Sequence, residues 1–360
     1  MPEHASFDLD GPDEPAGEEV LAGGGWPRWA WPLVIVCVVG VVAALLVTHG
    51  GNDPGATRHS TPPSVPTSTP SYGPPPPVAL DVAVGPSGAW VLDDDALLVV
   101  AGARTLRRIP LPELAGVTPD ATARLLLDPA APLLWIAVED GVHARLIEFG
   151  TDPLRKLRDV TWAEPLVAAA AYRGHVYVTT DLGAADLAPG AARPVYIPGL
   201  SPAVGPIAVD PSRHRIVLMD QGYPTDVWTY RPGGRPIETT DPLPFGKGSI
   251  AVVDGAIWAG GYAQSGAVLE RLDPATLRPV ARSPQQARFD PGAVVAGAGA
   301  RVLWVRSEGP YLWCVNATDG RIAQTFLVPT NVNGVASDRS GAVVASDGGA
   351  VELVLSGCPG

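Results

Sequence analysis

The longest apolar stretch of the chain lies near its start. Trp29–Thr48 is a run of twenty residues without a charge, bounded by Arg28 and His49. At 1.5 Å per residue a helix of this length spans about 30 Å, the thickness of a bilayer core. Trp26 and Trp31 lie at one end of it, where interfacial tryptophans are expected. The pattern predicts a single transmembrane helix over residues 29–48. The alternatives are a buried core helix and a cleaved signal peptide, but a signal peptide has a shorter apolar core and a basic leader.

From Val78 onward the pattern changes to apolar runs of four to seven residues, separated by Gly, Pro and Asp. Such runs predict β-strands. The runs also repeat: a strand, a turn and a second strand with a bulky residue near its middle recur along the chain, at intervals of 45, 42, 40, 41, 46 and 40 residues. The bulky positions are Trp90, Trp135, Tyr177, Val217, Trp258, Trp304 and Val344.

A period of 40–46 residues with about four strands per unit is typical of β-propeller blades. We therefore predict an all-β fold over residues 78–360, a seven-bladed β-propeller with four-stranded blades of which the last is incomplete. Residues 72–79 are a candidate for its missing strand, although Pro74–Pro77 cannot donate backbone hydrogen bonds. The alternative architecture is an open array of β-sandwich sheets. The recurring tryptophans are interpreted as packing between blades.

The repeat resembles the YVTN/NHL/Vgb-type seven-bladed propellers. The segments that carry the resemblance are Ile207-Ala-Val-Asp-Pro-Ser, Trp135-Ile-Ala-Val-Glu-Asp, Val268–Ala275 and Gly320-Arg-Ile-Ala. Members of this broad group include lyases, quinoproteins, sensor ectodomains and scaffolds, so the resemblance implies an architecture and no single activity. It also implies that ligands bind on the face built by the loops between second and third strands. The layout of tail, helix, linker and propeller is similar to membrane-anchored actinobacterial ectodomains.

Two polar segments flank the apolar helix. Residues 1–28 are rich in Asp, Glu, Gly and Pro and predict a disordered acidic cytoplasmic tail, which is either a solvated leader or a docking site for a partner. Residues 49–77 form a Pro/Ser/Thr-rich linker that favours extended conformations. Linkers of this kind are typical of exported domains. We therefore expect a single-pass protein of the cell membrane with its N-terminus in the cytoplasm and its propeller extracytoplasmic.

The net charge is −12, and an acidic chain is a poor ligand for nucleic acid. Three cysteines are present. Cys37 lies in the apolar run and is expected to be inert. Cys314 and Cys358 lie in the large domain and can form a disulfide if that domain is outside the cytoplasm. The alternative is two separate buried thiols, and the sequence leaves the oligomeric state undetermined.

A carboxylate follows the second strand in six of the seven repeats, at Asp93, Glu139, Asp181, Asp220, Glu308 and Asp347. One interpretation is a ring of acids on one face that binds a cation or a basic partner. The other is that these side chains shape hairpin turns by accepting backbone hydrogen bonds. Asp93-Asp94-Asp95 is the best local candidate for a cation, but it lacks the spaced ligands of a calcium loop.

Candidates for catalysis are few. His143 follows Glu139 and Asp140, and a lyase-type propeller needs a histidine base with a carboxylate partner. No metal-ligand spacing, nucleophile elbow, P-loop or cofactor-docking motif is found, so no cofactor and no metal are predicted. The sequence favours a binding, sensing or scaffolding module for a protein or a cell-envelope ligand. The alternatives are a lyase or hydrolase on the propeller face and a sensor ectodomain of a signalling assembly.

Overall fold

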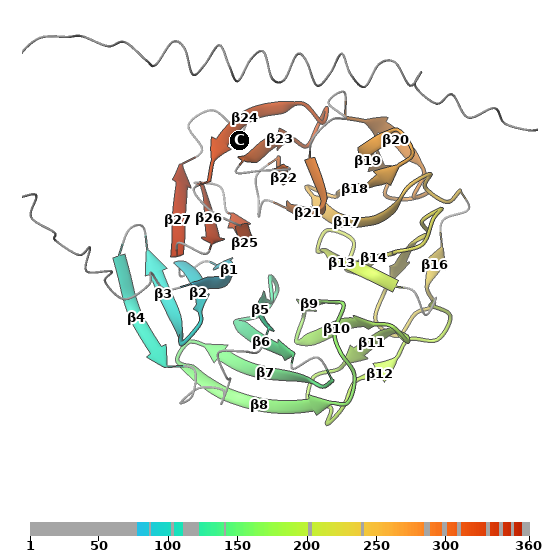
Figure 1. Cartoon of the computed structure of the whole chain (residues 1–360). Coiled ribbons are helices and arrows are strands. Elements are labelled where there is room, and N and C mark those ends of the chain that lie inside the picture. The colour runs from blue at the N-terminus through green and yellow to red at the C-terminus, as the bar shows by residue number, and fades with distance from the viewer. Residues whose placement is uncertain are drawn as a thin grey trace, which may run out of the picture. The chain divides into compact units, whose positions relative to one another are not determined.

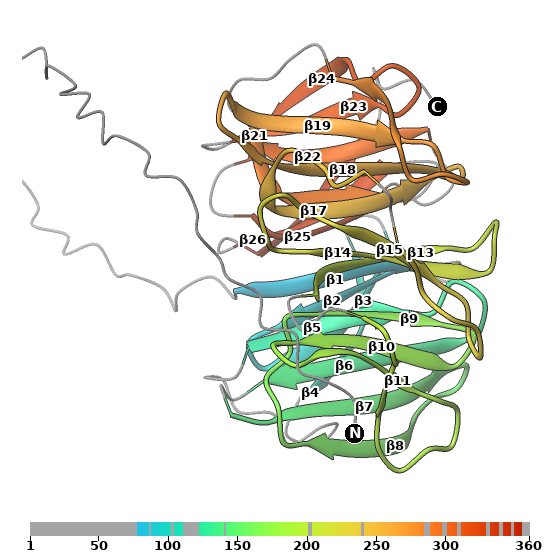
Figure 2. The same cartoon turned by 90° about the vertical axis from the view of Figure 1, so that its right-hand side faces the viewer.

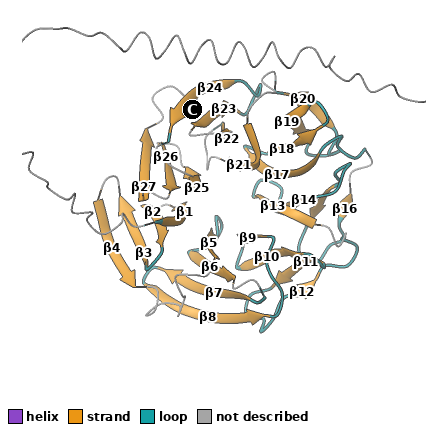
Figure 3. Ribbon diagram, in the orientation of Figure 1, coloured by secondary structure: helices purple, strands orange, loops and turns teal. Residues whose placement is uncertain are grey.

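The computed structural model describes most of the chain from Val78 onward (Figure 1). The described residues are 78–85, 88–101, 104–110, 122–139, 142–200, 204–238, 241–283, 289–296, 301–307, 311–328, 332–337, 341–346 and 349–354. All of them belong to the compact unit Tyr72–Gly360. They form strands joined by turns and loops (Figure 3), and none of them builds a helix able to span a bilayer. The predicted tail 1–28, helix 29–48 and linker 49–77 lie outside the described residues, so the membrane anchor stays a prediction.

The strands of the first four sheets are β1 (Ala79–Gly85), β2 (Gly88–Asp93), β3 (Ala96–Ala101) and β4 (Arg104–Pro110); β5 (Thr122–Leu127), β6 (Leu133–Glu139), β7 (Ala144–Thr151) and β8 (Leu154–Trp162); β9 (Ala168–Tyr172), β10 (His175–Thr180), β11 (Gly183–Leu187) and β12 (Val195–Tyr196); and β13 (Val204–Asp210), β14 (Arg215–Asp220), β15 (Val227–Tyr230) and β16 (Ile237–Glu238). The remaining strands are β17 (Gly246–Val253), β18 (Ala256–Ala263), β19 (Gly266–Leu272) and β20 (Pro279–Arg282); β21 (Phe289–Ala296), β22 (Val302–Ser307), β23 (Tyr311–Asn316) and β24 (Ile322–Leu327); and β25 (Val332–Ser337), β26 (Gly341–Ser346) and β27 (Gly349–Val354).

Each sheet is an antiparallel meander of consecutive strands. Six sheets have four strands and are complete blades, and the last, β25–β27, has three. The prediction of a β-propeller is therefore confirmed, but the described residues contain six complete blades rather than seven. The repeat counts hairpins of first and second strands, which occur seven times. A complete blade needs two more strands, and the described residues of the last unit supply one of them.

The core is divided into layers between neighbouring sheets. The described residues form seven clusters of buried apolar side chains, and each cluster joins two sheets that follow one another around the ring. The bulky position of every second strand is at most 3% exposed and belongs to one of these clusters. The predicted role of these residues in packing between blades is confirmed.

The ring closes where the last sheet meets the first. β1 packs against β25 and β26, and the Asn333 side-chain amide donates a hydrogen bond of 2.9 Å to the Ala79 carbonyl. The contact is built from small side chains, among them Val82, Val91 and Ala345. Figure 1 shows the first strands of all sheets around the centre and the fourth strands at the rim. The alternative of an open array is therefore wrong.

The strands of neighbouring sheets run alongside one another (Figure 2), so equivalent connections gather at the same end of the ring. Contacts between blades show this directly. The Thr179 hydroxyl at the end of β10 donates to the Gly205 carbonyl at the start of β13, at 2.7 Å. At the other end, the Tyr172 hydroxyl lies 2.7 Å from His214 Nδ1 in the β13–β14 turn.

We call the end with the connections from second to third strands, and into first strands, the entry face. The end with the remaining turns is the turn face.

Cys314 is fully buried in β23. Its predicted partner, Cys358, lies outside the described residues. The pairing of Cys314 with Cys358 therefore stays a prediction.

Candidate functional site

The predicted carboxylates belong to the entry face, because each ends or follows a second strand. Asp140, Glu308 and Asp347 lie outside the described residues. The other members differ in exposure: Asp93 and Asp220 are buried, Asp94 and Glu139 are half-buried, and Asp95 and Asp181 are exposed. These carboxylates are therefore not an equivalent set of ligands, because the backbone turn around each one determines its exposure.

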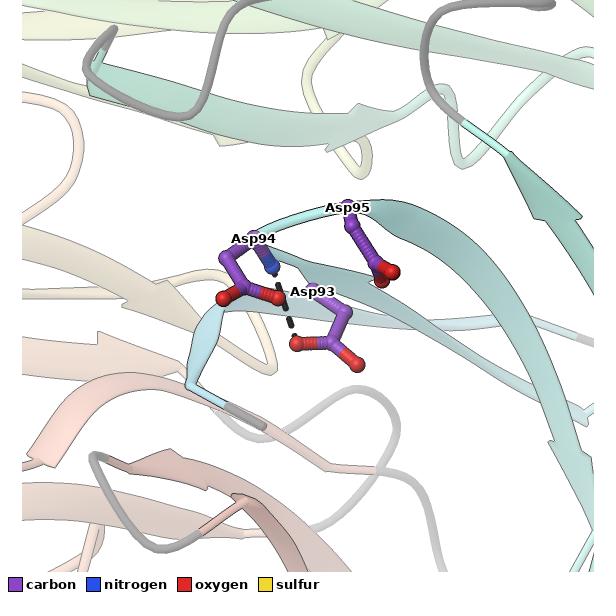
Figure 4. Close-up of side chains that lie close together, drawn as sticks. All are labelled: Asp93, Asp94 and Asp95. Carbon is purple, nitrogen blue, oxygen red and sulfur yellow. Dashed lines mark hydrogen bonds between the residues drawn. The ribbon is translucent and has the colours of Figure 1, made fainter. Parts of the chain in front are cut away.

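Among the described residues, Asp93, Asp94 and Asp95 form a close group of acids on this face (Figure 4), with one carboxylate oxygen from each lying within 4.8 Å of the others. Asp93 accepts a hydrogen bond of 2.8 Å from the Asp94 backbone N–H, and Asp95 pairs with Arg108 of β4. Burial raises the pKa of Asp93 to about 6, and the neighbouring acids add to that rise. The turn thus combines three acids with one neutralising arginine.

Asp220 has a structural role at the end of β14. Its Oδ1 accepts hydrogen bonds from the backbone N–H groups of Gly222, at 3.2 Å, and Asp226, at 3.1 Å. Burial raises its pKa, while these two bonds oppose the rise. Asp93 and Asp220 therefore shape their turns in the way that the second interpretation of the acidic positions requires.

The candidate acid–base pair lies in the second blade. Glu139 ends β6, opposite Ala144 at the start of β7, and the exposed His143 directly precedes Ala144. The two residues are therefore close along one connection, but Asp140 and the residue after it fall outside the described residues. A catalytic role for His143 and Glu139 stays a prediction.

The sequence interpretation missed a set of large apolar side chains on the entry face. One exposed residue of this kind lies at the connection from second to third strand in each of blades two to six. The exposed fractions are 61% for Val142, 64% for Leu182, 57% for Tyr223, 44% for Tyr262 and 45% for Tyr311. We call these five residues the apolar ring.

The remaining exposed large apolar residues in the described ranges lie on fourth strands: Leu106, Leu157, Val195, Tyr196, Ile237, Val280 and Leu327. The described turns of the turn face carry none of them. The entry face is therefore the apolar end of the ring, and blade one contributes Asp94 and Asp95 to it in place of an apolar residue.

A signal for the apolar ring was present in the sequence. Leu182 directly follows Asp181, while Val142, Tyr223 and Tyr311 each follow a predicted carboxylate by three residues. A short run of acid and apolar residue looks the same whether the apolar side chain packs inward or faces solvent. Only the exposure in the folded ring distinguishes the two.

A further carboxylate lies near the ring axis. Asp81 on β1 accepts hydrogen bonds of 2.8 Å from the backbone N–H groups of Val82 and of Leu125 on β5. Its pKa is raised to about 6, chiefly by burial, which these two bonds partly offset. Asp81 thus joins the first strands of two blades.

No protein-family model and no curated sequence matches the chain. Solved structures do match its fold. Virginiamycin B lyase from Staphylococcus aureus superimposes with a TM-score of 0.58 at 16% identity, over 78% of this chain and 95% of the lyase. The WD40 β-propeller domain of Doa1 gives 0.56 at 12% identity, over 78% and 93%. The fold is a β-propeller.

A third similar structure is PorZ, a bacterial surface component of the type-IX secretion system of Porphyromonas gingivalis. Its TM-score is 0.55 at 13% identity, and the match covers 78% of this chain but 37% of PorZ. Identities this low show a common fold alone. One of these proteins is a lyase and another is a surface component of a secretion system, so the common fold does not specify a function.

Proposed function

We propose that the chain is a binding module whose entry face docks a protein partner. The observation that carries the proposal is the apolar ring, one exposed large side chain in each of five consecutive blades. Soluble domains seldom gather large exposed apolar residues at one end without a partner for them. Three of the five are tyrosines, and tyrosine is among the residues that dominate binding energy at interfaces.

The charges next to the apolar ring define the kind of partner. Asp95 and Asp181 are exposed, and Asp94 and Glu139 are half-buried. The described connections from second to third strands, residues 94–95, 142–143, 181–182, 221–226 and 264–265, contain no lysine or arginine. Opposite charge speeds association and excludes partners of like charge. The surface therefore suits a protein segment with apolar and basic side chains.

The proposal includes display at a membrane. The uncharged run 29–48 is the anchor, the tail 1–28 is cytoplasmic, and the linker 49–77 carries the propeller outside the cell. The composition of these segments supports this arrangement. Disulfides form and persist outside the cytoplasm, so a Cys314–Cys358 disulfide is part of the proposal. The fully buried position of Cys314 is compatible with it.

The test compares two pairs of substitutions in the full-length protein, expressed in the cells that produce it. Leu182→Ser with Tyr223→Ser removes two members of the apolar ring in blades three and four. Val195→Ser with Ile237→Ser removes two rim residues of the same blades, which are 63% and 65% exposed. After cross-linking in the cells, we compare the amount of partner protein recovered with each variant and with the wild type. We expect this amount to fall at least tenfold in the first variant and to stay unchanged in the second.

Equal losses in both variants, or none in the first, would refute docking on the entry face. Thermal unfolding of each variant is the control for folding, because surface substitutions of this kind change stability by about 0.5 kcal/mol or less.

A further inference from the structure

The turn face has the opposite chemistry to the entry face. Its described turns in blades three to six carry eight arginines that are exposed or half-buried. They are Arg173, Arg193, Arg213, Arg231, Arg235, Arg278, Arg301 and Arg321. Every described hairpin turn of these blades on this face has an arginine within it or at its edge, with one exception. The exception is Asp254-Gly255 between β17 and β18, where Arg213 of the neighbouring blade donates a hydrogen bond of 3.0 Å to the Gly255 carbonyl.

The carboxylates near these arginines are fewer. Arg301 pairs with Asp254 at 3.3 Å, Arg278 with Asp241 at 2.8 Å and Arg321 with Asp319 at 3.9 Å. Asp273 is occupied by its own turn, accepting hydrogen bonds from Ala275 and Thr276. Arg213 also lies 3.6 Å from Asp210, a buried carboxylate that the buried Arg215 binds at 3.0 Å. With Arg215 included, nine arginines against these five acids leave an excess of four positive charges on one end of a chain whose net charge is −12.

The ion pairs of Arg278, Arg301 and Arg321 are exposed and do not neutralise this surface permanently. Each partner in them is about half or more exposed. Exposed pairs contribute little to stability and are screened by salt. Their arginines can therefore exchange a carboxylate for another anion, and a guanidinium binds phosphate with two parallel hydrogen bonds.

We infer that the turn face rests on an anionic phospholipid surface through these arginines, leaving the entry face free for its partner. The inference rests on the proposed membrane anchor but not on the proposed partner. The arginines come from four consecutive blades at one end of a ring, so they suit an extended anionic surface better than a single small ligand. The described turns of this face carry no large exposed apolar residue, and only Val195 and Ile237 directly follow two of them, which favours contact with headgroups over insertion.

The length of the chain before the propeller permits this orientation. The chain enters the first blade at the entry face, since β1 begins there. Residues 49–77 are 29 residues, which reach about 90 Å when extended at about 3.1 Å each. The strands of the blades have up to nine residues, or about 30 Å at 3.3 Å each. The linker is thus long enough to pass the rim and let the turn face meet the bilayer.

The test uses phenylglyoxal, which modifies exposed arginines, on the full-length protein in nanodiscs of phosphatidylcholine alone or with 30% phosphatidylglycerol. Mass spectrometry gives the rate at each arginine. We expect Arg193, Arg231 and Arg235 to react at least threefold more slowly in the anionic discs, and 0.5 M NaCl to remove the difference. Arg107, exposed in the interior of the outer strand β4, is the internal control and should react equally in both discs.

A variant with Arg231→Glu and Arg235→Glu should lose the protection of Arg193, whereas one with Arg107→Glu should keep it. Equal rates at Arg193, Arg231 and Arg235 in both discs would overturn the inference, as would a chain that enters neither disc. Protection by soluble polyphosphate but not by anionic discs would overturn it in favour of an anionic polymer. The Leu182/Tyr223 variant should retain lipid protection, which separates a failure here from a failure of the docking proposal.

Discussion

Asp81 is the residue on which three sheets converge. It binds backbone N–H groups on β1 and β5, and Gly334 of β25 lies so close that an added Cβ would come within 2.3 Å of its Oδ1. An acid with a raised pKa keeps its proton in the folded state at pH values where the unfolded chain has lost it. The folded state is then favoured at low pH, and this advantage disappears as the pH rises from 3.8 through about 6.

Substituting Asp81→Asn should remove this dependence. A rise from 3.8 to about 6 corresponds to roughly 2–3 kcal/mol of unfolding free energy between pH 4 and pH 7. Between pH 4 and pH 7 the wild type should lose this free energy and the variant should not. The unfolding free energy of the variant minus that of the wild type, measured by urea denaturation, should therefore rise by that amount. Asp273→Asn is the control of opposite sign, because hydrogen bonds from Thr276 and Ala275 lower the pKa of Asp273. The same pH slope in the wild type and in Asp81→Asn would contradict the role given to Asp81.

Individual side chains were predictable only where the repeat constrained them. Trp135 and Trp258 recur at one register of the second strand, and a large apolar residue there has to be buried between sheets. Asp93 and Asp220 look alike in the sequence to the exposed Asp181, since each follows a second strand. Their burial depends on how the neighbouring blade covers the turn, which no local pattern records.

At the scale of the strand, the closure of the ring depends on close approach of β1 and β25. Most interfaces between sheets contain tryptophan, tyrosine or phenylalanine, whereas this one is built from alanine and valine. Small side chains bury less apolar area, so a larger share of the stability rests on backbone proximity. Gly334 permits that proximity because it has no Cβ.

Replacing Gly334 with Ala should weaken the closure. The added methyl would meet Asp81 Oδ1 and the backbone of β1, and crowding of this kind typically costs about 1–3 kcal/mol. Gly150→Ala on β7 is the matched control, because its added Cβ would have no neighbour closer than 3.7 Å and should change stability by about 0.5 kcal/mol or less. Thermal denaturation of the two variants makes the comparison. If Gly334→Ala is as stable as Gly150→Ala, the closure does not depend on this approach.

Most strands could be predicted from alternating apolar runs and turn residues, as β13, Asp210-Pro211 and β14 illustrate. The short fourth strands could not, because β12 and β16 have two residues each and both are exposed. An exposed pair of residues leaves no apolar pattern. Such strands exist only because the third strand beside them provides hydrogen-bond partners, Asp186 for β12 and Trp228 for β16.

At the scale of the whole propeller, the two ends differ in chemistry. The entry face combines the apolar ring with Asp94, Asp95 and Asp181, and the turn face gathers eight arginines. The sequence showed the net charge of the chain but not its separation between faces. That separation follows only from the order of the strands, because successive connections alternate between the two ends and so place residues that are neighbours in sequence on opposite faces.

The most direct test of two chemically different faces is site-specific photo-cross-linking of the full-length protein in its own cells, with p-benzoylphenylalanine placed at residue 223, 235 or 157. We predict a protein adduct from the entry face at 223, a lipid adduct from the turn face at 235, and neither from the rim at 157, which lies inside the fourth strand β8. Protein adducts of the same size and yield at all three positions, or only at 235 or 157, would contradict this prediction.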